Sequence, residues 1–193
     1  KTSDNILGYL IESLKKLDIY NNINIVIVSD HGMVDVSEEK VINIDDFNIS
    51  GVIHDKGPLM SVTDREFTKK PSIANFPLIP HVTIVSSIEN NKLHYDNPLY
   101  DFLLIADEGW MMYTYDHLKE YNGKLPVKGM HGYNPDSMNM HAIFYAYGPK
   151  FRSGVQIDTF ELIHIYPMLC ELLGVQPFKG IDGKMEVLQS ILK

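Results

Sequence analysis

Residues 24–33 read Asn24-Ile25-Val26-Ile27-Val28-Ser29-Asp30-His31-Gly32-Met33, and this stretch indicates the fold most strongly. A run of β-branched residues without alternation predicts a strand buried on both faces, as in a parallel sheet flanked by helices. Asp30 and His31 follow that strand, where open α/β sheets gather their ligands. Their side chains suit Zn²⁺ or a similar divalent ion. The alternative is an Asp-His-Gly turn that only closes a strand.

The composition is that of one ordinary domain or of part of a larger one. The 193 residues are 45% hydrophobic and 22% charged, and no run approaches the ~20 apolar residues of a membrane span. The formal charge of −8 argues against a surface that coats nucleic acid, although it leaves nucleotides open as substrates. The chain begins with Lys1 and enters a helical pattern at once, so we expect a piece of a longer protein.

Helix and strand patterns alternate along the chain, which predicts an α/β fold with a mixed, mainly parallel sheet and flanking helices. Residues 47–100 do not fit this alternation, and we expect an insertion or lid-like subregion there. Pro167 and Gly174 mark the first turn and the end of one helix. Helices are further expected at 4–18 and 185–192, and strands at 23–29, 41–44, 59–63, 82–86, 102–106, 111–115 and 142–147.

A second candidate ligand, His131, lies about a hundred residues after the first pair, in a loop before the strand at 142–147. Its neighbour Gly132 lets the backbone bend closely around a ligand. An ordinary turn histidine is the alternative. Together with Asp30 and His31 it would form one site at an end of the sheet. Two Zn²⁺ ions ~3.5–4 Å apart would need about six protein ligands and a nucleophile, which is more than this chain offers.

Five motifs follow one another along the chain: Ser29-Asp30-His31-Gly32-Met33, Asp107-Glu108-Gly109-Trp110, His131-Gly132-Tyr133, and the segments 140–151 and 165–174. Together they resemble the ectonucleotide pyrophosphatase/phosphodiesterase family of the alkaline phosphatase superfamily. The resemblance covers nearly the whole chain and is loosest over 50–90. It implies an alkaline-phosphatase-like fold, with residues 1–193 as the C-terminal portion of a single phosphodiesterase catalytic domain.

The resemblance also implies a two-zinc phosphodiesterase site. Asp30 and His31 map onto ligands of one metal, and His131 maps onto a ligand of the other. The family's remaining ligands and its Thr or Ser nucleophile lie N-terminal to residue 1, so the isolated chain is expected to be inactive. In the complete site two zinc ions would activate the nucleophile and clamp the phosphoryl oxygens. Each metal-bound imidazole would donate its second ring N–H to a carbonyl or carboxylate, with candidate carboxylates at Asp35, Asp45 and Glu108.

Other residues have simpler interpretations. Trp110 and the stretch 113–115 suit contact with a base or lipid and suit a half-buried strand equally well. Cys170, the only cysteine, is expected to be a buried thiol; the resemblance also allows pairing with a cysteine outside this chain. Asn48-Ile49-Ser50 is a glycosylation sequon. Solvent exposure or local hydrogen bonds are expected for His54, His81, His94, His117, His141 and His164.

The interpretation favoured by these motifs is a metal-dependent phosphodiesterase or nucleotide pyrophosphatase. Its substrates would be nucleotides or other phosphodiesters, and its partner would be the N-terminal half of the catalytic domain, in the same chain or a separate one. The resemblance implies a location outside the cell or in the secretory pathway. Two alternatives stay open: another hydrolase of the superfamily, such as a phosphomonoesterase, and an inactive fragment or binding module.

Overall fold

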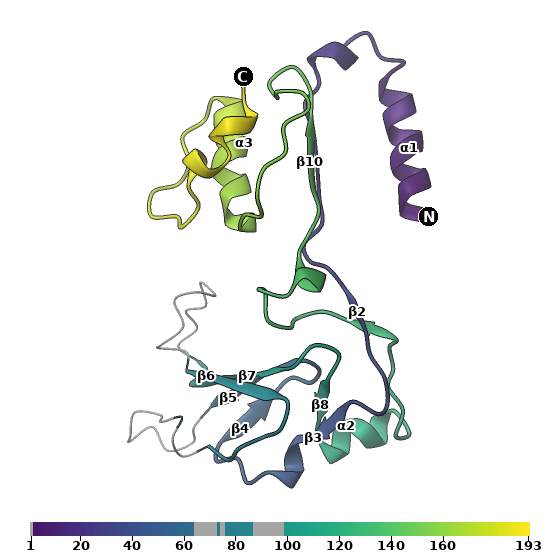
Figure 1. Cartoon of the computed structure of the whole chain (residues 1–193), viewed down its shortest axis with the longest axis vertical. Coiled ribbons are helices and arrows are strands. Elements are labelled where there is room, and N and C mark those ends of the chain that lie inside the picture. The colour runs from purple at the N-terminus through teal and green to yellow at the C-terminus, as the bar shows by residue number, and fades with distance from the viewer. Residues whose placement is uncertain (1, 64–72, 74–75, 87–98) are drawn as a thin grey trace. The chain divides into compact units, whose positions relative to one another are not determined.

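The computed structural model describes residues 2–63, 73, 76–86 and 99–193 (Figure 1). The chain divides into two compact units. The first unit comprises Lys1–Asp30 and Ile143–Lys193, and the second comprises His31–Ala142. The division falls between Asp30 and His31, directly after the strand that the sequence predicts.

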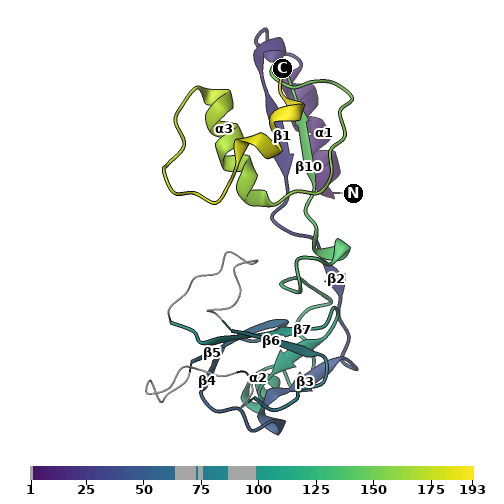
Figure 2. The same ribbon diagram turned by 60° about the vertical axis from the view of Figure 1, so that its left-hand side comes forward.

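The first unit is a pair of strands between helices. β1 (Ile25–Val28) pairs antiparallel with β10 (Phe144–Tyr147). Figures 1 and 2 show α1 (Thr2–Leu14) and α3 (Ile165–Leu173) on opposite sides of this pair. Short 3₁₀ helices complete the unit at Tyr20–Asn22 (η1), Leu162–His164 (η6), Met185–Val187 (η7) and Gln189–Ile191 (η8).

The core of the first unit lies on the α3 side of the strand pair. Met168 of α3 is fully buried there, and Val26 and Phe144 pack against the same cluster. Tyr145 and Tyr147, at the alternate positions of β10, are exposed. The first three residues of β1 are half-buried, and its last residue, Val28, is 44% exposed. The expected burial on both faces is not found for this strand.

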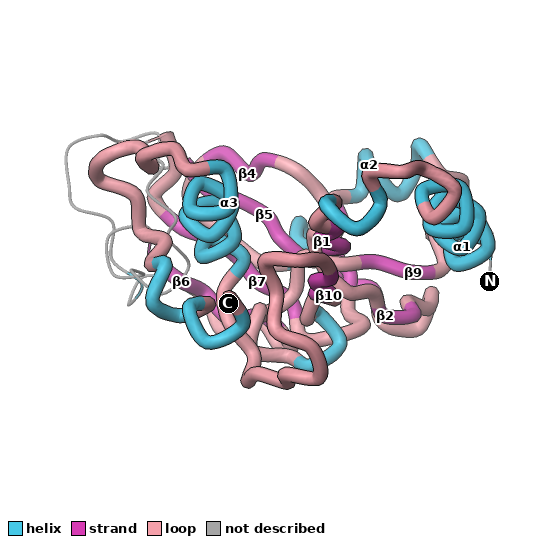
Figure 3. The backbone as a smooth tube through the Cα atoms, turned by 90° about the horizontal axis from the view of Figure 1, so that it is seen from above, coloured by secondary structure: helices cyan, strands magenta, loops and turns pink. Residues whose placement is uncertain are grey.

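The second unit is built on a four-stranded sheet. Its strand order is β4 (Val52–His54), β5 (Leu59–Thr63), β7 (Phe102–Ala106) and β6 (Val82–Ser86), and all three pairings are antiparallel. Figure 3 shows these strands side by side. β7 is buried along its whole length because it lies inside the sheet. Cross-strand packing of its apolar side chains supplies much of the core.

Three smaller elements complete the second unit. β3 (Val41–Asn43) and β8 (Met111–Tyr113) pair in parallel, and β2 (Val34–Asp35) pairs antiparallel with β9 (Gly129–Met130). The helical segments are η2 (Ile44–Asp46), α2 (Tyr115–Glu120) and η5 (Met138–Met140). Tyr133 and Met140 enter the same core as Leu104 and Met112, so the loop that carries His131 is tied to the sheet.

The structure confirms the predicted α/β class, and the strands predicted at 59–63, 82–86 and 102–106 are found at those bounds. The direction of pairing differs from the expected mainly parallel sheet. Within the described residues only β3 and β8 pair in parallel. A run of β-branched residues indicates an apolar strand, but it does not indicate whether the neighbouring strand pairs with it in parallel or antiparallel.

Other boundaries also differ. The helix expected at 4–18 spans Thr2–Leu14, and the helix expected at 185–192 is two 3₁₀ turns. Gly174 ends α3 in the left-handed conformation, with φ of 67°, as expected of a C-terminal glycine. The predicted insertion at 47–100 contains β4, β5 and β6 and stays a prediction; 64–72, 74–75 and 87–98 lie outside the described residues. Within the described ranges, no helix has the length and apolar character needed to cross a membrane.

Candidate metal centre

Two histidines a hundred residues apart in sequence lie face to face in the second unit. The ring centroids of His31 and His131 are 3.5 Å apart, and the ring planes are tilted by 12°. His31 is half-buried and His131 is exposed. The structure therefore brings together two of the three predicted ligands, on a surface that a ligand can reach.

The position of His31 depends on the glycine that follows it. The Gly32 N–H donates to the Met140 carbonyl at 3.0 Å. A Cβ at residue 32 would lie 1.9 Å from the Asn139 carbonyl oxygen, far inside contact distance. Only glycine allows the backbone beside His31 to approach η5 so closely.

The position of His131 depends on the tyrosine two residues later. Tyr133 is only 5% exposed, and its hydroxyl lies 3.6 Å from the Met111 sulfur. Gly132 has φ of 98°, a left-handed conformation that glycine adopts without steric cost. Burial raises the pKa of Tyr133 to about 12, against the opposing effect of a hydrogen bond from the Gly109 backbone. The chain thus turns at Gly132 between an exposed imidazole and a buried phenol.

One nitrogen of His31 has a defined role. Its Nδ1 lies 2.7 Å from the Gly32 carbonyl oxygen. Because a carbonyl can only accept, we assign the proton of the neutral ring to Nδ1. The lone pair then lies on Nε2, the state in which an imidazole binds a metal. A second nitrogen that donates to a carbonyl is the arrangement expected of a metal-bound histidine.

The stacking limits what the pair can bind. An imidazole binds zinc in its own ring plane, with a Zn–N distance of ~2.0–2.1 Å. Two planes separated by 3.5 Å and tilted by 12° meet only roughly 16 Å away. The two rings therefore cannot share one zinc ion in this arrangement. They suit two separate ions in a centre whose metals lie ~3.5–4 Å apart.

Asp30 and the candidate carboxylates come from several segments of the chain. Asp30 belongs to the first unit, while His31 belongs to the second. Asp45 accepts the Tyr115 N–H at 2.7 Å, so this carboxylate serves the start of α2. Asp35 is exposed. Across the part of the chain that the structure describes, no group of three or more His, Cys, Asp or Glu side chains could hold a metal ion.

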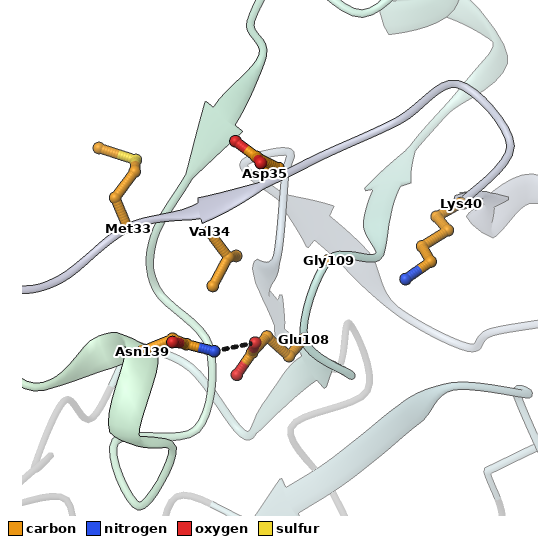
Figure 4. A pocket seen from close by; sticks show the side chains of 7 residues that line it. All are labelled: Met33, Val34, Asp35, Lys40, Glu108, Gly109 and Asn139. Carbon is orange, nitrogen blue, oxygen red and sulfur yellow. Dashed lines mark hydrogen bonds between the residues drawn. The ribbon is translucent and has the colours of Figure 1, made fainter.

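Glu108 belongs to a network that sequence reasoning did not find. Its carboxylate accepts hydrogen bonds from Ser137 and Asn139. These bonds lower the pKa of Glu108 below its ordinary value, and the nearby Lys40 ammonium adds to the effect. The only signal in the sequence was the motif at 107–110, which does not name the partners. A cavity of about 340 Å³ opens beside this network (Figure 4), lined by Met33, Val34, Asp35, Lys40, Glu108, Gly109 and Asn139.

Three of the other histidines, His54, His81 and His164, have local hydrogen-bonding partners. His54 contacts the Thr63 hydroxyl at 3.1 Å, and the His164 Nδ1 accepts the Lys184 N–H at 2.9 Å. His81 lies 3.0 Å from the Asp107 carboxylate and stacks on Trp110 at 3.9 Å. These contacts agree with the expected local hydrogen bonding. His94 lies outside the described residues.

Trp110 and the stretch 113–115, which suit either contact with a base or lipid or a half-buried strand, also have defined places, as does the lone cysteine. Tyr113 is buried and Trp110 packs against the core, so both serve the interior. Tyr115 is exposed and donates its hydroxyl to Asp46 at 2.6 Å. Cys170 is a buried free thiol in this chain, as expected. Asn48 and Ser50 of the sequon are exposed.

Comparison with known proteins agrees with the resemblance in the motifs. The family model for type I phosphodiesterase / nucleotide pyrophosphatase matches residues 1–134. The chain is 32% identical over 187 residues to the bis(5'-adenosyl)-triphosphatase enpp4 of Xenopus laevis, which covers 93% of this chain and 40% of that protein. It is 31% identical over 179 residues to human ectonucleotide pyrophosphatase/phosphodiesterase family member 5, covering 89% of this chain and 36% of that protein.

Solved structures match over the full chain. Human ectonucleotide pyrophosphatase/phosphodiesterase 5 has a TM-score of 0.82 and 29% identity, and the match covers all of this chain and 51% of that one. An inactive form of the murine protein, in complex with AMP, has a TM-score of 0.80 and 27% identity. The chain thus spans about half of these solved chains and 40% of the length of the Xenopus relative.

Proposed function

Because the chain belongs to the type I phosphodiesterase/nucleotide pyrophosphatase family, we propose that it supplies part of a two-zinc centre that hydrolyses phosphodiester or pyrophosphate bonds. His31 and Asp30 hold one ion in this proposal, and His131 holds the other. The remaining ligands and the nucleophile come from the N-terminal half of the catalytic domain, in the same chain or a separate one.

The observation that carries the proposal is the stack of His31 on His131. The two rings lie within reach of neighbouring ions, and their planes are too nearly parallel to serve a single ion. The Nδ1 contact of His31 with the Gly32 carbonyl leaves Nε2 for the metal. When bound, the zinc pair supplies Lewis-acid stabilisation of the phosphoryl charge and activation of the attacking oxygen.

The substrate class follows from the relatives. One is named a bis(5'-adenosyl)-triphosphatase, and a solved relative is in complex with AMP. We therefore propose nucleotides joined through pyrophosphate or phosphodiester bonds as substrates of the full-length protein. The name of a further relative, ectonucleotide pyrophosphatase/phosphodiesterase, supports a location outside the cell or in the secretory pathway.

The direct test uses purified full-length protein and two chromogenic esters. We expect it to hydrolyse the p-nitrophenyl ester of thymidine monophosphate faster than p-nitrophenyl phosphate, with zinc bound. His31→Ala and His131→Ala should each lower kcat/KM by more than about 100-fold, because each removes a metal ligand. His164→Ala, which removes a histidine from the first unit, is the matched control and should leave kcat/KM unchanged.

The same assay separates the alternatives. Preference for the monoester would assign the protein to a phosphomonoesterase of the same superfamily and overturn the diesterase proposal. Zinc binding with neither ester hydrolysed would instead support an inactive or purely binding member. Wild-type activity in both histidine variants would refute the assignment of these residues.

A further inference from the structure

The turn between β7 and β8 is one of the best-anchored segments of the second unit. Both strands are buried along their lengths. The Trp110 N–H closes the turn on the Asp107 carbonyl at 2.9 Å, and Gly109 sits in it with φ of 83°. The His81 ring stacks on Trp110 and bonds Asp107. Glu108, at the tip, therefore projects from a fixed support.

Glu108 connects this support to η5. Ser137, the N-cap residue of η5, donates its hydroxyl to one carboxylate oxygen, and Asn139 donates its amide to the other at 2.6 Å. Figure 4 shows the Asn139 amide facing the Glu108 carboxylate. Bonds from neutral donors to a carboxylate are shorter and stronger than bonds between neutral groups. Since both oxygens accept hydrogen bonds from residues of η5 and its N-cap, Glu108 anchors this short helix to the turn.

η5 and its N-cap in turn hydrogen-bond to the backbone at Gly32 and at Asn134, close in sequence to the two histidines. Its Met140 carbonyl accepts the Gly32 N–H at 3.0 Å, directly after His31. Its N-cap, Ser137, donates its backbone N–H at 3.0 Å to the Asn134 carbonyl, which lies three residues after His131. The two loops that carry the imidazoles thus meet on one short 3₁₀ helix. Such a helix has few hydrogen bonds of its own and depends on external contacts to stay in place.

We propose that Glu108 is a positioning residue of the centre: through η5 it holds the backbones of His31 and His131 in the register that stacks their rings. The proposal rests on the proposed function, because it gives Glu108 a role in zinc binding. Glu108 stays ionised at neutral pH, because its two hydrogen bonds and Lys40 lower its pKa.

The test measures zinc affinity of the full-length protein by competition with a chromogenic chelator. Glu108→Ala should weaken zinc binding by about 10- to 100-fold, the loss typical of residues that support metal ligands. It should lower kcat for the thymidine ester and leave KM nearly unchanged, because a positioning residue acts on the reaction through the metal ligands. Asp136→Ala removes an exposed carboxylate from the loop that precedes η5, and it should change neither quantity.

Three further variants keep the test independent of folding. Ser137→Ala with Asn139→Ala removes the donors and leaves the carboxylate, and the loss of zinc affinity should match that of Glu108→Ala. Combining all three changes should add little, since the groups act as a unit. Glu108→Gln keeps one acceptor oxygen and should recover part of the affinity.

The outcomes are separable. A Glu108→Ala protein with a lower Tm but unchanged zinc affinity would show a purely structural role and overturn the inference. Zinc-binding losses in Asp136→Ala equal to those in Glu108→Ala would also overturn it, since net charge would then explain both. If the wild-type protein bound no zinc, the proposed function would be refuted, and the positioning role of Glu108 would be refuted with it.

Discussion

Replacement of Gly32 by alanine is the sharpest test of how the fold positions the histidines. The added Cβ would lie 1.9 Å from the Asn139 carbonyl oxygen, and an ordinary contact begins at 3.4 Å, so η5 and the residue-32 backbone must separate by about 1.5 Å. Overpacking of this kind costs about 1–3 kcal/mol. The Gly32–Met140 hydrogen bond would lengthen as well, at about 0.5–1.5 kcal/mol. We expect the free energy of unfolding to fall by about 2–4 kcal/mol.

The same displacement would shift the His31 ring relative to the His131 ring and disturb their stacking. Misplacement of a functional group by ~1 Å commonly costs on the order of 100-fold in activity. We therefore expect Gly32→Ala to weaken zinc binding of the full-length protein and to lower its diesterase kcat, on the order of 100-fold for the latter. Denaturant unfolding, chelator competition and ester hydrolysis measure the three effects on one preparation.

Gly8→Ala provides the matched control. Gly8 lies inside α1, and a Cβ there has open space within 4 Å. Alanine in the middle of a helix is more favourable than glycine by roughly 0.5–1 kcal/mol, so the free energy of unfolding should rise slightly. Zinc affinity should not change. If Gly32→Ala unfolded at the wild-type denaturant concentration and kept wild-type zinc affinity, the described approach of Gly32 to η5 would be refuted.

Three further predictions follow from individual contacts. Tyr133 has a folded-state pKa of about 12, above the ~10 of an unfolded tyrosine. Its contribution to the free energy of unfolding should therefore be complete below pH 10 and be lost as the pH rises to 12. Tyr133→Phe should flatten that decline when unfolding is measured against pH. Thr114→Ala removes the cap that accepts the His117 N–H at 3.2 Å, and should cost about 1 kcal/mol in thermal unfolding without a change in zinc affinity. The isolated 193-residue chain should show no diesterase turnover and should bind zinc more weakly than the full-length protein; sustained turnover by this piece would contradict the proposed division of ligands.

Local sequence patterns predicted the strands that are buried and short. β7 is an apolar run between turn residues, so its burial and its bounds follow from composition alone. Gly174 predicted the end of α3, because glycine readily adopts the left-handed conformation in which this helix ends. β1 was correctly predicted as a strand. Its half-burial and its antiparallel pairing depend on which segments pack beside it, and the sequence of one strand does not identify those segments.

The candidate centre was predictable in its residue types and not in its geometry. The motifs indicated His31 and His131 as candidate ligands, but only the tertiary structure shows that their rings stack. The role of Glu108 could not be read from its motif, because Ser137 and Asn139 lie about thirty residues away and carry no recognisable pattern. Contacts between distant loops depend on the whole packing of the second unit.

The most direct test of the central claim is the anomalous scattering of crystals of the full-length protein at the zinc absorption edge. We expect two peaks ~3.5–4 Å apart, one about 2.1 Å from a ring nitrogen of His31 and the other at the same distance from a ring nitrogen of His131. A single peak ligated by both rings, or peaks remote from both, would contradict it.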